Sequence, residues 1–108
     1  MRDFKELVLC AWHNDRVEVH VSADLEDDSL TISGYDLGSY VEDVWGDFDY
    51  EYWYFFNKVN TDRLFAAIHG KDDPEAALLR EFSGEAGCRT LRELCQKNAI
   101  EYSFQSYA

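Results

Sequence analysis

The sequence predicts a single α+β domain, spanning residues 1–108, in which a mostly antiparallel sheet of about five strands carries about three helices on one face. Three observations lead to this prediction. Up to about Asn57, apolar and polar residues alternate with a period of two, which is typical of half-buried strands. After Asn57 the apolar period changes to about 3.6, which is typical of helices. In the last segment, 100–107, the alternation returns.

Three short strands are predicted in the first third of the chain, at residues 6–13, 17–22 and 29–33. A turn signal at 13–16 joins the first two as a hairpin, and an acidic turn at 24–28 leads into the third. In the second and third strands one alternating set is apolar and is expected to face the core: Val17, Val19, Val21, Leu30 and Ile32. Residues 36–45 are expected to form a short helix or an ordered loop, because Gly38 weakens an otherwise helical pattern.

The fourth predicted strand, 48–57, has two contrasting sides. One side is entirely aromatic, with Phe48, Tyr50, Tyr52, Tyr54 and Phe56. The other is first acidic and then aromatic, with Asp47, Asp49, Glu51, Trp53 and Phe55. Burial of large rings is strongly favourable, whereas carboxylates without partners are not buried. We therefore expect the aromatic side to face the helices and the acidic side to face outward, unless the N-terminal strand or a loop covers Trp53 and Phe55.

Helix boundaries follow from capping residues. The first helix is expected to begin at Asn60 or Thr61 and to stop at Gly70, and the second to begin at Asp73-Pro74. The second helix should end at 83–84, and a third helix is expected at about 88–98. A last strand follows, in which Ile100, Tyr102 and Phe104 alternate.

The first residues predict neither a secretory signal nor a membrane span. The longest apolar run near the start is Leu7–Trp12, and no stretch approaches the ~20 apolar residues of a spanning helix. Three cysteines, Cys10, Cys88 and Cys95, cannot all pair within one chain, which favours reduced thiols. We expect a cytoplasmic protein that does not bind membranes.

The excess negative charge is confined to one segment. The net charge is −12, and between Val17 and Asn57 there are eleven acidic residues and no Lys or Arg. The rest of the chain carries eleven acidic and ten basic residues, so it is almost neutral. This sign of charge disfavours direct contact with nucleic acid, because phosphates are bound by Lys and Arg. It favours a basic protein partner; the alternative is that the acids only keep the protein soluble.

Metal and catalytic sites are not indicated by the motifs. One side of the fourth predicted strand carries three carboxylates, Asp47, Asp49 and Glu51. Neighbouring side chains on that side are about 7 Å apart along the strand, which is too far for all three to coordinate one ion. Cys88 and Cys95 form no zinc-type pair, and the glycines form no phosphate-binding loop. We expect no metal, no cofactor and no enzymatic activity.

One run of residues carries a family resemblance. The sequence LTISGYDLGSYVEDVWGDFDYEYWYFF, followed by NTDRLFAAIHG, resembles small acidic immunity proteins of bacterial polymorphic toxin systems, including contact-dependent inhibition. The likeness covers residues 29–70, and more loosely the three-helix, one-strand tail. It implies a cytoplasmic protein that binds one cognate toxin domain, often a nuclease, and blocks its active site. No residue-level binding motif is carried over.

Charge and resemblance together predict a toxin-neutralising binding protein; an acidic interaction or scaffold module of unrelated function is the alternative. The basic cleft of a nuclease is the kind of surface that an acidic segment can compete for. The expected contact residues are the acids of the segment and the adjacent ring: Asp24, Glu26, Asp27, Asp28, Asp36, Glu42, Asp43, Asp47, Asp49, Glu51 and Trp53.

Overall fold

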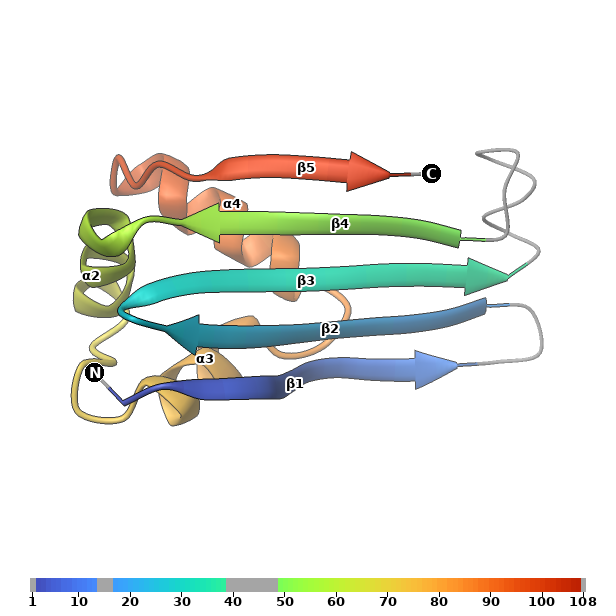
Figure 1. Cartoon of the computed structure of the whole chain (residues 1–108), viewed down its shortest axis with the longest axis horizontal. Coiled ribbons are helices and arrows are strands. Elements are labelled where there is room, and N and C mark those ends of the chain that lie inside the picture. Colours follow the sequence, from blue (N-terminus) through green and yellow to red (C-terminus); the bar gives the residue numbers. More distant parts are fainter. Residues whose placement is uncertain (1, 14–16, 39–48, 108) are drawn as a thin grey trace.

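The computed structural model describes residues 2–13, 17–38 and 49–107. These residues form the predicted α+β domain, with one five-stranded antiparallel sheet and three helices (Figure 1). The strands are β1 (Phe4–His13), β2 (Val17–Glu26), β3 (Ser29–Gly38), β4 (Asp49–Phe56) and β5 (Ser103–Tyr107). The helices are α2 (Lys58–Ala67), α3 (Pro74–Phe82) and α4 (Gly87–Lys97).

The strands lie in the sheet in the order β1-β2-β3-β4-β5, and each pairs antiparallel with the next. The chain leaves the sheet after β4, forms the three helices and returns as β5 beside β4. The first strand is therefore an edge strand within the sheet. It does not lie over Trp53 and Phe55, as one sequence-based alternative allowed.

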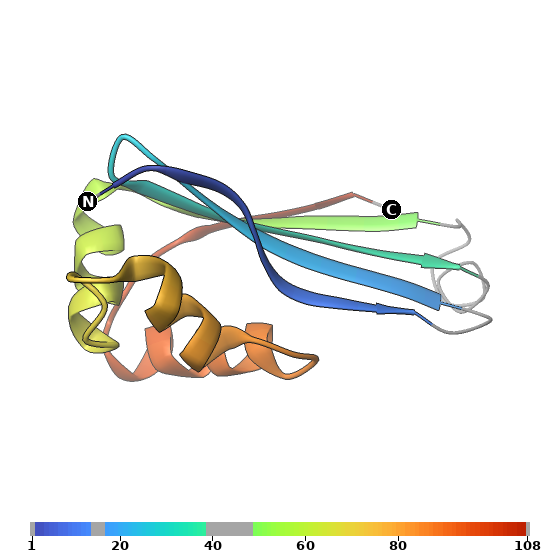
Figure 2. The same ribbon diagram turned by 90° about the horizontal axis from the view of Figure 1, so that it is seen from below.

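The helices lie on one face of the sheet (Figure 2). They are gathered at the end where β2 turns into β3, and the strands extend beyond them toward the end where β1 stops (Figures 1 and 2). The molecule measures 40 × 24 × 22 Å. We call the sheet face without helices the open face, and the opposite one the helix-side face.

The helix-side face carries the core, and strand β4 shows this directly. Tyr54 and Phe56 are each only 2% exposed, whereas Phe55 between them is 38% exposed. The Tyr54 ring packs against Tyr102 and Phe104, with centroids 5.4 and 5.0 Å away. Arg92 of α4 donates a hydrogen bond to the Tyr54 hydroxyl at 2.8 Å. The aromatic side of β4 thus faces the helices, as predicted; Phe48 lies outside the described residues.

The β2–β3 connection is tighter than predicted. The expected acidic turn at 24–28 is wrong, because Asp24 and Glu26 are the last part of β2 and only Asp27 and Asp28 form the turn. Both turn residues have positive φ, 50° and 60°, which is the two-residue type I′ geometry that matches the twist of a hairpin. Asp tolerates this conformation better than most residues.

Strand β3 is also longer than predicted. Residues 36–38, expected to begin a helix or loop, continue β3 instead, with Asp36 opposite Val19 and Tyr50. Cross-strand hydrogen bonding on both sides of β3 outweighs the weak strand preference of Asp and Gly. The remainder of the expected 36–45 element, and residues 14–16 of the first predicted turn, lie outside the described residues.

Helix α2 begins earlier than predicted. Its N-cap is Asn57, whose side chain accepts a hydrogen bond from the Asn60 N–H at 2.9 Å, so capping by Asn60 or Thr61 is wrong. Thr61 is fully buried, and its hydroxyl joins α2 to the sheet. It accepts from the Leu30 N–H at 3.0 Å and donates to the Phe56 carbonyl at 3.2 Å. Asn57 caps α2 because it directly follows the last residue of β4, whereas the side chain of Thr61 faces the core.

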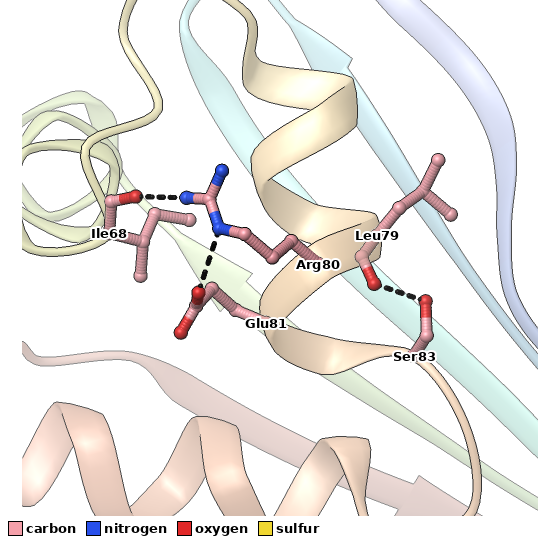
Figure 3. Close-up of polar contacts among 5 residues, drawn as sticks. All are labelled: Ile68, Leu79, Arg80, Glu81 and Ser83. Atoms are coloured by element: carbon pink, nitrogen blue, oxygen red, sulfur yellow. Dashed lines mark hydrogen bonds and ion pairs between the residues drawn. The ribbon is translucent and has the colours of Figure 1, made fainter.

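The ends of α2 and α3 are joined by polar contacts. The left-handed residue after α2 is His69, with φ 54°, and the predicted stop Gly70 is the next residue. Arg80 of α3 donates to the Ile68 carbonyl at 2.6 Å and to Glu81 at 3.0 Å (Figure 3). Asp73 caps α3 as predicted. Helix α3 ends at Phe82, and Ser83 closes it by donating to the Leu79 carbonyl (Figure 3).

Candidate partner-binding face

A shallow groove on the open face contains two of the predicted contact residues, Glu51 and Trp53. Its volume is about 470 Å³. Cross-strand pairing places Trp53 beside Ser33 and Glu51 beside Tyr35, and on the next strand Ser22 pairs with Ser33. The two serines are short, so they form a floor between larger side chains. The groove therefore follows directly from the register of β2, β3 and β4.

The walls of this groove come from four strands. Val8 of β1 pairs with Ser22 and closes one side, while Trp53 closes the other. The His20 and Tyr35 rings, paired across β2 and β3, stack with centroids 5.2 Å apart and an interplanar angle of 8°. Flat rings next to a shallow floor provide apolar contact area with little rotamer entropy to lose.

The charge of the groove is negative. Glu51 lies in it, and Glu6 of β1 contributes a second carboxylate. Within the described lining there is no Lys or Arg. A long cationic side chain could lie over the serine floor, contact Trp53 and pair with Glu51, which is the arrangement of an aromatic anchor beside an orienting charge.

A second acidic group lies at the β2–β3 turn, apart from the groove. Four residue steps along β3 separate Ser29 from Ser33, the nearest groove residue of that strand, about 13 Å at the usual rise of a strand. Asp27 in this turn forms an ion pair with Lys58 at 3.4 Å, and its N–H donates to Asp3 at 3.2 Å. The turn, which also holds Asp28 and directly follows Glu26 of β2, is therefore a separate and partly neutralised patch.

Asp24 has a structural role within the sheet. Its carboxylate accepts a hydrogen bond from the Glu6 N–H at 2.6 Å. Glu6 has a positive φ of 53° and lies where the β1–β2 register shifts. Such a bulge leaves a backbone N–H without a ladder partner, and Asp24 supplies the acceptor.

Asp36 lies on the other face from Glu51. It continues the helix-side set of β3, after Leu30, Ile32 and Gly34. Burial raises the pKa of its carboxyl above the usual value. The eleven predicted contact residues therefore do not share one surface. Glu42, Asp43 and Asp47 lie outside the described residues, as does the side chain of Asp49.

Charge is nevertheless separated between the layers of the fold. Seven acidic and seven basic residues lie from Lys58 to Lys97, so the helical part of the chain is neutral. The whole net charge of −12 is carried by the strands and the segments next to them. A cationic surface would therefore be attracted to the sheet and not to the helices.

Seven groove residues were not among the predicted contacts: Glu6, Val8, His20, Ser22, Ser33, Gly34 and Tyr35. Glu6, Val8 and His20 lie in predicted strands, and an outward position for His20 follows from the alternation of 17–22. The neighbours of Glu51 and Trp53 depend on register across the sheet, which no local pattern specifies.

Within the described ranges, no three His, Cys, Asp or Glu side chains gather closely enough to hold a metal ion. None of the described helices has the length and apolar character needed to cross a membrane. Comparison of the chain with family models, with curated proteins and with solved structures finds no match.

Proposed function

We propose that this protein binds a basic protein partner through the groove of the open face, and that the partner is a cognate toxin domain neutralised in the cytoplasm. The observation that carries the proposal is the groove itself. It combines the Glu51 carboxylate, the Trp53 ring and a floor of two serines in the acidic layer of the fold. The proposal that the partner is a toxin domain rests on the resemblance to immunity proteins. The proposal that the partner is cationic rests on the groove.

The binding mechanism follows from charge and shape. An Arg or Lys of the partner would lie along the Ser22–Ser33 floor, with its stem against Val8 and Trp53 and its charge at Glu51. The net charge of the strands would steer the encounter and raise the association rate at low salt. A nuclease cleft is basic because it must attract phosphate, so occupation by this face would exclude its substrate.

The test takes as its candidate partner any basic C-terminal domain that a reading frame next to this gene encodes. We expect the purified domain to bind with an affinity that falls as salt rises, and co-expression of this protein to restore growth of cells that produce the domain. Glu51→Lys should weaken binding by about 2–5 kcal/mol, because it removes a carboxylate that faces a cation and leaves that cation unpaired.

The matched control is Glu93→Lys, which makes the same charge change at an exposed position of α4. It should change the affinity only slightly. Equal losses from both variants would show a non-specific charge effect and contradict the proposed site. Binding at the groove without protection from the toxin would favour the scaffold alternative.

A further inference from the structure

A second hollow lies on the helix-side face, where the strands extend beyond the helices. Its volume is about 570 Å³, within the range typical of small-molecule sites. Val17, Val19 and Val21 of β2 and Trp12 of β1 form its apolar walls. The α3–α4 connection forms one side, fixed to the sheet by a hydrogen bond from the Gly84 N–H to the Leu9 carbonyl at 3.0 Å.

The polar groups of this cavity are acidic or neutral. Asp36 and Glu85 are its two carboxylates, and both act on the Cys10 thiol, whose pKa is raised first by burial and then by these two charges. Asp36 also contributes to the raised pKa values of Tyr52 and Cys88, after the larger effect of burial on each. Asp36 thus lines the same cavity as these three groups, and its charge acts on each of them.

Among the described residues, no cationic side chain lines the cavity beside this charge. The described lining contains no Lys, Arg or His, and no ion pair or hydrogen bond to Asp36 is found in the described ranges. Two aromatic residues, Trp12 and Tyr52, complete the lining. Apolar walls, aromatic faces and a partly desolvated carboxylate are the features that bind an organic ammonium ion.

We propose that this cavity binds a small organic amine, with its apolar body against the valines and Trp12 and its ammonium group at Asp36. The site is on the opposite sheet face from the groove of Glu51 and Trp53, and the proposal does not depend on the proposed function. A neutral apolar molecule would leave the Asp36 charge without a partner, and a carboxylate ligand would be repelled by it.

The probe is 2-phenylethylamine, with 2-phenylethanol as the neutral analogue of nearly the same shape. Both are titrated into the full-length, ¹⁵N-labelled protein, and the indole N–H signals of Trp12 and Trp53 report the two sheet faces separately. We expect the amine to shift the Trp12 signal saturably and to leave the Trp53 signal in place. We expect the alcohol to bind at least about tenfold more weakly, because a single charge pair at a half-buried site is worth roughly that factor.

Asp36→Asn keeps the size of the side chain and removes its charge. It should weaken amine binding about tenfold and leave alcohol binding unchanged. Glu93→Gln, on α4, should change neither. The proposal is overturned if the amine gives no saturable shift of Trp12, if amine and alcohol bind wild-type protein equally, or if folded Asp36→Asn binds the amine as well as wild type does. The comparison of the two ligands on wild-type protein decides the matter even if the variant does not fold.

Discussion

Thr61 is the side chain whose replacement tests the packing of helices on the sheet most clearly. Its hydroxyl accepts from the Leu30 N–H and donates to the Phe56 carbonyl, at 3.0 and 3.2 Å, in a fully buried position. Thr61→Val keeps the shape and removes both hydrogen bonds. A buried backbone group without a hydrogen-bond partner costs about 1–3 kcal/mol, and Thr61→Val affects two such groups, the Leu30 N–H and the Phe56 carbonyl. Because the carbonyl has a second lone pair that can still accept, we expect the free energy of unfolding to fall by about 2–4 kcal/mol.

The assay is equilibrium unfolding in urea followed by far-ultraviolet circular dichroism, with the slope of the transition checked for constancy. Thr61→Ser is the matched control, because it keeps both hydrogen bonds and loses one methyl group, which costs about 1 kcal/mol. Valine should therefore be the more destabilising of the two. If Thr61→Ser loses as much stability as Thr61→Val, the hydroxyl does not join α2 to the sheet as described.

Three further predictions concern the sheet. Burial raises the pKa of Asp36, so the folded state holds its proton more tightly than the unfolded state, and the free energy of unfolding should fall as pH rises from about 4 through the raised pKa. Asp36→Asn should remove this pH dependence of the free energy of unfolding and be more stable than wild type at pH 7. Urea unfolding of both proteins at about pH 4 and at pH 7 measures the difference. Asp24→Ala should cost about 1 kcal/mol by leaving the Glu6 N–H without its acceptor, whereas Asp24→Asn, which keeps an acceptor, should cost less. Equal losses would mean that the hydrogen bond contributes nothing. Gly34→Ala would place a methyl group 2.2 Å from the Tyr52 ring, so thermal unfolding should show a loss of about 1–3 kcal/mol, and an unchanged transition would contradict the observed packing.

The faces of the strands could be predicted because the pleat of a strand fixes them locally. Alternation alone places Tyr54 and Phe56 on the buried side and leaves Phe55 exposed. The same rule, applied to Leu30 and Ile32, gives the buried side of β3. These assignments need no knowledge of neighbouring strands.

The groove could not be predicted, because it depends on which residues of different strands lie side by side. The stacking of His20 on Tyr35 joins residues that are distant in sequence and is set by the β2–β3 register. Asp36 is grouped with the other acids on sequence grounds because it belongs to the segment without Lys or Arg, and the predicted strand ends at residue 33. In the sheet it occupies a helix-side position, which an acid tolerates because the helices do not extend that far and the carboxylate stays partly in water.

The N-terminal boundary of α2 shows a different kind of limit. Asn57, Asn60 and Thr61 are all good capping residues, and local preference does not separate them. The end of β4 decides, because the chain must turn directly after Phe56, and Thr61 is then needed by the sheet.

The central claim is that a basic partner binds the open face at Glu51 and Trp53. The most direct measurement adds a basic toxin domain that this protein neutralises on co-expression to ¹⁵N-labelled protein, and follows the indole N–H signals of the tryptophans. The account predicts that the Trp53 signal shifts or broadens at stoichiometric amounts, that the Trp12 signal does not, and that Glu51→Lys abolishes the change at Trp53. A bound complex in which Trp53 is unaffected while Trp12 or the helical residues respond would contradict it.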